Sequence, residues 1–376
     1  MSQGDKRTCR RGVWLGGALL LAFLGSAPAE PPAPEFRILG RYPLRPGGSP
    51  FTDIRWATDN SVFVMRTYHG LEEIQIEPEL KTLRQPVPPV KVLGGFDRMA
   101  RLGVSDRYLA FASDGEIMAW RPRDSQAPGV VVFRRKEVGL AEDIDLSGDR
   151  LLLLGTPYRP RDPKFFTASG VAWLGSLGSD LKDWKPLLLE PDGPGGRKAP
   201  ALFDCGAAGL GAVRFLADQS ILVVPGFLPG AYQFDAQGNP IRTWSQQELG
   251  LTTDCRKISD KVATEIVGPP STRLPWLNRQ RLVEDILPFP QGPGLLIRSS
   301  RADGKVIWVI KILGPQGVTT YALPVVGNRP TDRLRADFRN GRLALLLHSD
   351  VLPSTDKEDQ YGELILAELP GQEGGN

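Results

Sequence analysis

The feature that most constrains the fold is a repeated pair of short apolar stretches. In each pair an alternating stretch precedes a short polar turn and a more continuously apolar stretch. Alternation is typical of a β-strand with one buried face, and a short continuous run fits a strand buried on both faces. Six such pairs occur: 53–56 with 62–65, 102–104 with 109–111, 144–146 with 151–154, 213–215 with 221–224, 286–289 with 295–297, and 334–338 with 343–347. The sequence therefore predicts six copies of one β unit.

The spacing of the units indicates how many strands each contains. Between Ile54 and Ala336, equivalent positions lie about 48, 42, 69, 73 and 50 residues apart. This is near the period of a four-stranded propeller blade, provided that two of the units carry insertions. A middle strand of a blade packs against neighbours on both faces, so its continuous apolar sequence is expected. A β-sandwich or several small domains is the alternative, but six units exceed what one sandwich uses.

The sixth unit needs a strand from elsewhere in the chain. Only a few polar residues follow its third strand, 363–369, whereas 36–44 form a strand without a unit of its own. Pairing this strand with the last blade would close the ring and remove an exposed edge. We therefore expect an all-β domain over 36–370, a six-bladed β-propeller closed by an N-terminal strand. A Pro-rich linker over 30–35 precedes it, and a disordered tail over 371–376 follows it.

Glycine and proline supply the turns of this domain. The chain contains 42 Gly and 34 Pro, and helical periodicity is hard to find before residue 245. The two largest insertions, 191–210 and 245–282, flank the fourth unit, and the second contains a predicted helix over Asp254–Val267. The pattern of units resembles that of the six-bladed bacterial propellers of the NHL and TolB-like type. This resemblance covers nearly all of 36–370 and implies the fold rather than a function.

The first 29 residues have the order of segments found in a secretory signal. Four basic residues precede a thirteen-residue apolar run, 13–25, and the small-residue stretch 26–29 follows. A membrane-spanning helix needs about 20 residues, so this run is too short for a permanent anchor. We expect cleavage near Ala29 and an exported protein, periplasmic or extracellular, with no membrane insertion after cleavage. The sequence leaves Sec and twin-arginine export open.

The net charge does not indicate a nucleic-acid partner. The whole chain carries +3, but the leader holds four bases and one acid, so the domain that follows is formally neutral. Nucleic-acid binding relies on a basic surface that neutralises phosphates. We therefore expect no nucleic-acid partner, and the oligomeric state stays open.

Two cysteines remain after the leader, Cys205 and Cys255. In an oxidising compartment such a pair is more often bridged than free. A bridge would close a loop of about fifty residues and stabilise the fold by roughly 4 kcal/mol. Each cysteine lies in one of the two large insertions, so the predicted disulfide would join them. Two buried free thiols are the alternative.

Equivalent positions at the start of the first strands predict a polar ring near the channel. Alignment of the units by the apolar pair across the first turn assigns six residues to this ring: Asp53, Arg101, Asp143, Ala212, Asp285 and Arg335. The fifth position is ambiguous by one residue because Pro288 and Pro290 disturb its turn. Three acids and two bases are candidates for binding a polar ligand. They can also neutralise one another between blades, and we favour this structural interpretation.

Long loops on one face of a rigid scaffold commonly carry recognition. The loop after the second strand of unit 3 is basic and aromatic and includes Arg159, Arg161 and Lys164, whereas the corresponding loop of unit 6, 348–362, is mostly acidic. Both loops are expected on the face where the first strands begin, which we call the loop-rich face. We expect this face to bind a protein or polymer ligand. The alternative is that the loops only decorate the scaffold.

No catalytic motif in the sequence identifies a reaction. The two histidines, His69 and His348, each fall at the end of a predicted second strand, and no metal-ligand spacing follows either of them. We therefore expect a non-catalytic binding protein. The alternative is a propeller enzyme with its site at the channel, either a metal-dependent hydrolase or lactonase or a carboxylate-based lyase.

One stretch of the sequence is a candidate calcium-binding loop. Residues Asp143–Gly148 resemble the start of a calcium loop, but the twelfth position is Leu154 rather than an acid. A hairpin turn at Ser147-Gly148-Asp149 explains the same residues. We expect no cofactor, and calcium is the alternative.

Overall fold

The structure is a computed structural model of the chain. The chain divides into two units, Met1–Pro32 and Ala33–Asn376. The predicted signal segment and the predicted C-terminal tail lie outside the described residues. Those described are 33–44, 49–67, 69–77, 79–87, 101–112, 117–124, 131–134, 140–156, 170–177, 184–189, 211–225, 230–251, 280–349 and 362–370.

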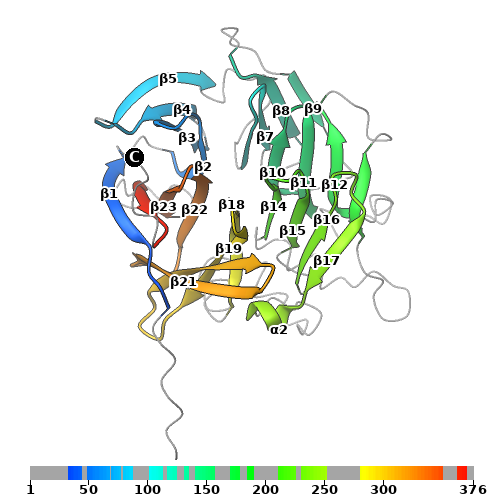
Figure 1. The fold of residues 1–376 in the computed structure, drawn as a ribbon. Coiled ribbons are helices and arrows are strands. Elements are labelled where there is room, and N and C mark those ends of the chain that lie inside the picture. Colours follow the sequence, from blue (N-terminus) through cyan, green and yellow to red (C-terminus); the bar gives the residue numbers. More distant parts are fainter. Residues whose placement is uncertain are drawn as a thin grey trace, which may run out of the picture. The chain divides into compact units, whose positions relative to one another are not determined.

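The described strands of the second unit form six sheets of four strands each, arranged in a ring (Figure 1). We number these blades 1 to 6. Blade 1 contains β2 (Phe51–Trp56), β3 (Ser61–Arg66), β4 (Gly70–Gln75) and β5 (Lys81–Val87). Blade 2 contains β6 (Arg101–Val104), β7 (Tyr108–Ala112), β8 (Ile117–Pro122) and β9 (Val131–Arg134). Blade 3 contains β10 (Leu140–Ser147), β11 (Arg150–Thr156), β12 (Gly170–Ser176) and β13 (Lys185–Leu189).

The second half of the ring repeats this plan. Blade 4 contains β14 (Gly211–Phe215), β15 (Ile221–Pro225), β16 (Ala231–Phe234) and β17 (Pro240–Trp244). Blade 5 contains β18 (Leu282–Phe289), β19 (Gly292–Ser300), β20 (Val306–Gly314) and β21 (Gly317–Gly327). Blade 6 contains β22 (Asp332–Arg339), β23 (Arg342–Ser349), β24 (Gly362–Glu368) and β1 (Arg37–Leu44). The six predicted strand pairs coincide with the first two strands of the six blades, so the predicted all-β six-bladed propeller is confirmed.

The hydrophobic core is divided among the interfaces between neighbouring blades. In β3, Val62 and Val64 belong to the cluster shared with blade 6, whereas Phe63 and Met65 belong to the cluster shared with blade 2. Successive side chains of a strand point to opposite faces, so a middle strand between two blades needs apolar residues at nearly every position. All six residues of β3 are buried accordingly.

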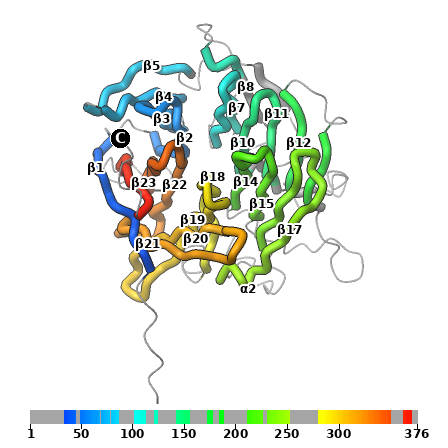
Figure 2. The backbone as a smooth tube through the Cα atoms, in the orientation of Figure 1, coloured from blue at the N-terminus to red at the C-terminus, as the bar shows by residue number. Residues whose placement is uncertain are grey.

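The strand β1 closes the ring by completing blade 6. It pairs antiparallel with β24, with Arg37 opposite Glu368, and the first and last strands of the domain lie side by side (Figure 2). The residue before β1 also contacts blade 5, because the backbone N–H of Phe36 donates to the carbonyl of Ala322 at 3.1 Å. The Phe36 ring lies in the core between blades 5 and 6. The predicted closure by an N-terminal strand is therefore confirmed.

One short helix is described in the insertion after blade 4, α2 (Gln246–Leu249). Its N-terminus is a capping box, in which the Ser245 side chain accepts from the backbone of Glu248 and the Glu248 side chain accepts from the backbone of Ser245. Gly250 ends the helix at φ 62°, in the left-handed region that favours glycine. The helix predicted over Asp254–Val267 lies outside the described residues.

Within the described part of the chain, no helix has both the length and the apolar character needed to cross a membrane.

Candidate functional site

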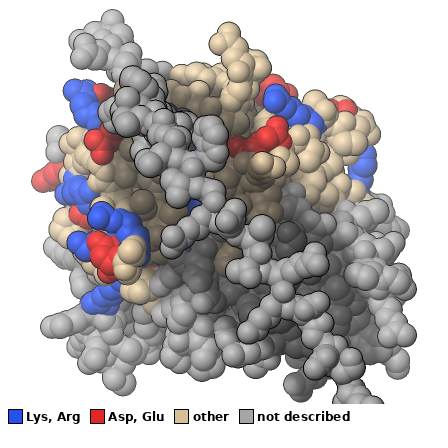
Figure 3. Space-filling model, turned by 90° about the horizontal axis from the view of Figure 1, so that it is seen from below, with Lys and Arg blue, Asp and Glu red and all other residues tan. Residues whose placement is uncertain are grey.

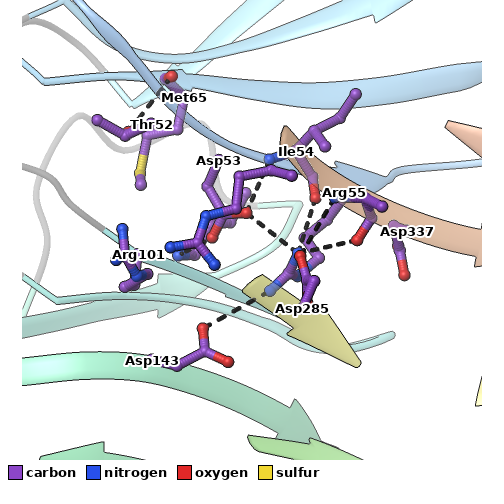
Figure 4. A network of polar contacts seen from close by, with 12 residues as sticks. Thr52, Asp53, Ile54, Arg55, Met65, Arg101, Asp143, Asp285 and Asp337 are labelled. Carbon is purple, nitrogen blue, oxygen red and sulfur yellow. Dashed lines mark hydrogen bonds and ion pairs between the residues drawn. The ribbon is translucent and has the colours of Figure 1, made fainter. Parts of the chain in front are cut away.

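The first strands of the blades surround the channel and bring the predicted ring residues together. Neighbouring first strands contact one another all around the ring, in the order β2, β6, β10, β14, β18, β22. The carboxylates of Asp53, Asp143 and Asp285 come from three different blades, and all three form ion pairs with one guanidinium, that of Arg55 (Figure 4). Arg101 and Arg335 are near enough to affect the pKa values of this group. The five charged residues predicted for the ring thus share one site.

Each of the three ring acids accepts a backbone hydrogen bond from the next blade. The oxygen Asp53 Oδ2 accepts from the N–H of Leu102 at 2.9 Å. The oxygen Asp143 Oδ2 accepts from Val213 at 2.9 Å, and Asp285 Oδ2 accepts from Ala336 at 3.2 Å. The three donors are equivalent, because each directly follows the ring position of its own blade, which Arg101, Ala212 and Arg335 occupy. This regularity also resolves the ambiguous fifth position in favour of Asp285.

The bonding pattern has a simple physical cause. A first strand has a ladder partner on one side only, so the N–H groups on its channel side need another acceptor where water is excluded. A carboxylate on the neighbouring first strand supplies this acceptor. Acids at the ring position in blades 1, 3 and 5 therefore connect the blades in pairs, from 1 to 2, from 3 to 4 and from 5 to 6.

Arg55 lies at the centre of the polar network and is 2% exposed. Its Nη1 donates to Asp53 Oδ1 at 3.0 Å and to Asp285 Oδ2 at 3.3 Å. Its Nη2 lies 3.8 Å from Asp143 Oδ1, an ion pair without a hydrogen bond. Burial lowers the pKa of Arg55, but these three carboxylates and that of Asp337 together outweigh burial and raise the pKa above its usual range. Arg55 was not among the predicted ring residues, although it lies two positions after Asp53 on the same face of β2.

The carboxyl groups around Arg55 differ in their affinity for a proton. Burial raises the pKa of Asp143 to about 7, in spite of the opposing charge of Arg55. Burial acts in the same direction on Asp285, but Arg55, Arg335 and Arg214 hold the pKa of Asp285 below its ordinary value. The buried network therefore contains one carboxyl that titrates near neutral pH. Such a group is typical of acid–base sites and also of structural ion pairs.

A second polar layer lies two residues further along the first strands and was missed in the sequence. The side chain of Asp145 accepts from the backbone N–H of Phe215 at 2.8 Å, and Asp337 accepts from that of Trp56 at 2.8 Å. These bonds repeat the connection from one blade to the next. The period-two alternation of a strand, applied to the predicted ring, was the signal that could have found this layer.

The second layer forms the floor of a funnel of about 870 Å³. The funnel opens where the first strands end, on the face opposite the loop-rich face. Its floor includes Arg55, Asp145, Arg214 and Asp337, and its rim includes the turns between the first and second strands. Asp143 is 0% exposed and is not among the described residues that line the funnel.

Arg214 is, with Arg55, a floor residue with spare hydrogen-bonding capacity. Its Nη2 donates to Asp337 Oδ1, and its Nη1 lies 3.7 Å from Asp145 Oδ1. This Nη1 atom is buried and has no hydrogen-bond acceptor. The Arg214 side chain is 6% exposed and lines the funnel.

The predicted loop site and the predicted disulfide fall in other parts of the chain than the described ones. Arg159, Arg161 and Lys164 lie outside the described residues, as do both cysteines of the predicted disulfide, Cys205 and Cys255.

The two histidines lie near the ends of second strands, as the sequence predicts. His348 is buried in β23, and His69 lies between β3 and β4. Neither of them lines the funnel. In the part of the chain that the structure describes, no group of three or more His, Cys, Asp and Glu side chains could hold a metal ion.

The stretch that resembles a calcium loop is a strand and a hairpin turn. Residues Asp143 and Asp145 belong to β10, which is joined to β11 through Gly148 and Asp149. Gly148 has φ 61°, in the left-handed region expected of glycine in a tight hairpin. Both acids accept backbone N–H groups of blade 4. These residues are therefore explained by the hairpin.

Charge on the described surface is mixed in sign. On the face shown in Figure 3, basic and acidic side chains stand next to one another over the described part. The funnel has the same balance, with the arginines 55, 123, 214 and 339 and the aspartates 59, 106, 145 and 337. The site can therefore form directed polar contacts without a strong preference for the sign of a ligand's net charge.

No protein family and no curated protein sequence matches this chain. Among solved structures, U3-55K is similar at TM-score 0.48 and 11% identity, covering 86% of this chain and 98% of that chain. The WD40 β-propeller domain of Doa1 gives 0.43 and 8%, covering 88% and 97%. The virginiamycin B lyase from Staphylococcus aureus gives 0.43 and 10%, covering 89% and 100%. The likenesses are too weak to carry an argument about ligand or activity.

Proposed function

We propose that this chain is an exported, non-catalytic β-propeller that binds a protein or polymer ligand through its loop-rich face. The proposal includes the export signal, the disulfide between the two insertions and the likeness to NHL and TolB-like propellers. One observation carries its non-catalytic part. The five described channel carboxylates, Asp53, Asp143, Asp145, Asp285 and Asp337, each accept a backbone N–H of the next blade.

Carboxylates that already accept backbone hydrogen bonds are more typical of a structural scaffold than of an acid–base catalytic site. A general acid or base needs an oxygen within hydrogen-bond reach of a substrate proton. Asp53, Asp143 and Asp285 are at most 1% exposed and connect neighbouring blades. Their hydrogen bonds favour a rigid ring, and a rigid ring is a suitable support for recognition loops.

The basic loop of unit 3 provides the experiment. Replacement of Arg159, Arg161 and Lys164 by Ser removes three positive charges from the loop-rich face. A charge-matched control replaces three exposed residues on the opposite face, Lys81, Arg107 and Lys185, by Ser. We expect both variants to melt within a few degrees of the parent protein, because exposed charges contribute little to stability.

The two variants are then compared by ligand capture. Each protein is immobilised and exposed to the exported fraction of the source cells. The loop variant should capture less than the parent protein. The difference should be largest at low salt, where electrostatic association is strongest. The control variant should capture as much as the parent protein. Equal capture by the loop variant and the control would overturn recognition by this loop.

One observation favours the enzymatic alternative. Asp145 and Asp337 both line the funnel, and burial raises the pKa of Asp145 above its ordinary value. Two carboxyl groups in one cleft can divide the roles of acid and base. If the funnel is an active site, Asp145→Asn should abolish turnover of an identified substrate and leave the fold intact. The loop variant should then retain that turnover.

A further inference from the structure

The funnel floor offers a donor and an acceptor that do not satisfy each other. The Nη1 atom of Arg214 has no hydrogen-bond acceptor, and the nearest carboxylate oxygen, Asp145 Oδ1, is 3.7 Å away. That separation is too long for a hydrogen bond. The other oxygen of Asp145 already accepts from Phe215. The floor therefore holds a buried N–H without an acceptor, 3.7 Å from a carboxylate oxygen.

A hydroxyl group fits this pair. A hydroxyl both donates one hydrogen bond and accepts others. An oxygen placed about 2.8 Å from each atom would accept from Arg214 and donate to Asp145. A carboxylate ligand would also accept from Arg214, but it would lie against Asp145 and Asp337. An ammonium group would bind Asp145 but would lie against Arg214. The pair therefore selects a neutral group that both donates and accepts.

The rim carries further neutral hydrogen-bonding groups. The hydroxyl of Ser147 donates to the side-chain oxygen of Gln219 at 2.7 Å, across blades 3 and 4. The side-chain amide of Asn340 donates to Asp59 at 2.9 Å. These groups are exposed or partly exposed, so they are accessible to a ligand that already occupies the floor.

The walls between floor and rim are partly apolar. Pro288 and Pro290 line the funnel, and Trp56, Phe215 and Phe338, each at most 7% exposed, contribute a small part of their surface to it. The Trp56 ring is held in place, because its indole N–H donates to the carbonyl of Asp337 at 3.1 Å. Sugar rings combine apolar C–H faces with hydroxyl edges, and so they match a cleft with apolar walls and a polar floor.

The size of the funnel sets the length of the ligand. At about 870 Å³, it lies within the range of roughly 300–1,000 Å³ usual for small-molecule sites. It has room for a few sugar residues and is too small for a folded protein domain. We propose that the funnel binds the terminal residues of a neutral oligosaccharide or polysaccharide, with Arg214 and Asp145 holding one hydroxyl group. This site is separate from the loop-rich face of the proposed function.

Calorimetric titration of the purified protein tests the proposal. The probes are neutral hexasaccharides of glucose, mannose and N-acetylglucosamine, with hexagalacturonate and hexalysine as charged comparisons. We expect saturable binding of at least one neutral probe and weaker binding of both charged ones. Arg214→Lys keeps the charge beside Asp337 but loses the planar two-nitrogen group. Arg214→Lys and Asp145→Asn should each weaken the binding of the neutral probe at least tenfold.

A steric variant keeps the test valid if the floor variants fail to fold. Ala217 is exposed and lines the funnel, so Ala217→Trp adds bulk without removing a contact, and it should also weaken binding at least tenfold. The variant with Ser at Arg159, Arg161 and Lys164 should bind the oligosaccharide like the parent protein. Failure of every neutral probe to bind, or binding unaffected by Ala217→Trp, would overturn the proposal. Tighter binding of hexagalacturonate or hexalysine would do so as well. None of these results bears on capture by the loop-rich face.

Discussion

At the scale of single residues, the first strands around the channel are connected from blade to blade by hydrogen bonds to carboxylates. Asp53, Asp143 and Asp285 each supply an acceptor to the next blade, and Arg55 lies within ion-pair distance of all three. A charge held in a dry interior becomes strongly destabilising once its partner is removed. The stability of the ring centre therefore depends on one arginine more than on any of the acids around it.

Replacement of Arg55 by Met should be strongly destabilising. The variant leaves Asp53, Asp143 and Asp285 buried without their shared cation, and loss of one partner of a buried pair costs about 3 to 5 kcal/mol. The matched control is Arg301→Met, because Arg301 pairs with Asp303 at 3.6 Å with more than half of its side chain exposed. The control should cost less than about 1 kcal/mol. Urea unfolding measures both. Equal losses in the two variants would show that the network is not coupled to stability.

The raised pKa of Asp143 predicts a specific dependence of stability on pH. The folded protein holds a proton on Asp143 up to about pH 7, whereas the unfolded chain releases it near the ordinary value of 3.8. Between these values the folded state binds more protons than the unfolded state, so the free energy of unfolding decreases as pH rises. The slope approaches about 1.4 kcal/mol per pH unit for one proton.

The variant Asp143→Asn should lose this contribution, so its stability should change less than that of the parent between pH 4.5 and pH 7. The other charged groups that face Asp143, namely Asp53, Asp285, Arg55, Arg101 and Arg335, remain in both proteins. Asp145, whose pKa burial also raises, remains as well and cancels in the difference. Chemical unfolding at several pH values provides the measurement, with Asp303→Asn as the exposed control. Parallel profiles of Asp143→Asn and the parent protein would contradict the prediction.

At the scale of elements, β1 has a larger role than its eight residues suggest. It supplies the outer strand of blade 6, and the segment before it bonds to blade 5. Phe36 packs there against Tyr321 and Phe289, with ring centroids 5.8 Å and 6.2 Å away. The segment therefore joins two blades in addition to pairing with β24.

Deletion of residues 36–44 should abolish cooperative unfolding or cause aggregation. The deletion exposes the edge of β24, and an unpaired edge strand is a template for association with other chains. A pair of point variants separates packing from pairing. Phe36→Ser should cost several kcal/mol, since Phe36 is 2% exposed, whereas Leu39→Ser should cost little, since Leu39 is 42% exposed. Calorimetric melting and light scattering report the outcome. A sharp melting transition of the deletion variant near that of the parent would refute the closing role of β1.

The sequence was informative where one physical requirement repeats. The apolar stretch 62–65 revealed β3 because each middle strand has to face two blades, and the same requirement recurs six times. The ring acids were found for the same reason. Arg55 and Arg214 were not found, because their role depends on the distance across the channel between strands far apart in the chain. The free Nη1 of Arg214 is likewise a property of three-dimensional placement, which no repeat in the sequence encodes.

At the scale of the whole molecule, the domain is a closed ring in which every described interface has its own apolar cluster. Six clusters serve the six pairs of neighbouring blades, and each combines residues from two sheets. In such a ring each apolar cluster lies between two blades, so a single blade cannot bury its apolar faces alone. Stability therefore depends on the presence of all six blades together.

Intact-mass measurement of the protein recovered from its native compartment tests export and the predicted bridge together. We expect a mass that corresponds to a chain beginning near Glu30. Alkylation without reductant should add no mass, and alkylation after reduction should modify both Cys205 and Cys255. A retained leader would contradict export, and two modified thiols without reductant would contradict the disulfide.

The pairing of β1 with β24 also determines when the ring can form. Arg37 leaves the ribosome, and in an exported protein crosses the membrane, long before Glu368, its partner in the finished sheet. Contacts between such distant residues form slowly, because a long loop has to be closed first. Until β24 emerges, β1 has no ladder partner and blade 6 does not exist. Ring closure is therefore the last step in assembly, and a chain that stalls before residue 362 presents open edges to every neighbouring chain.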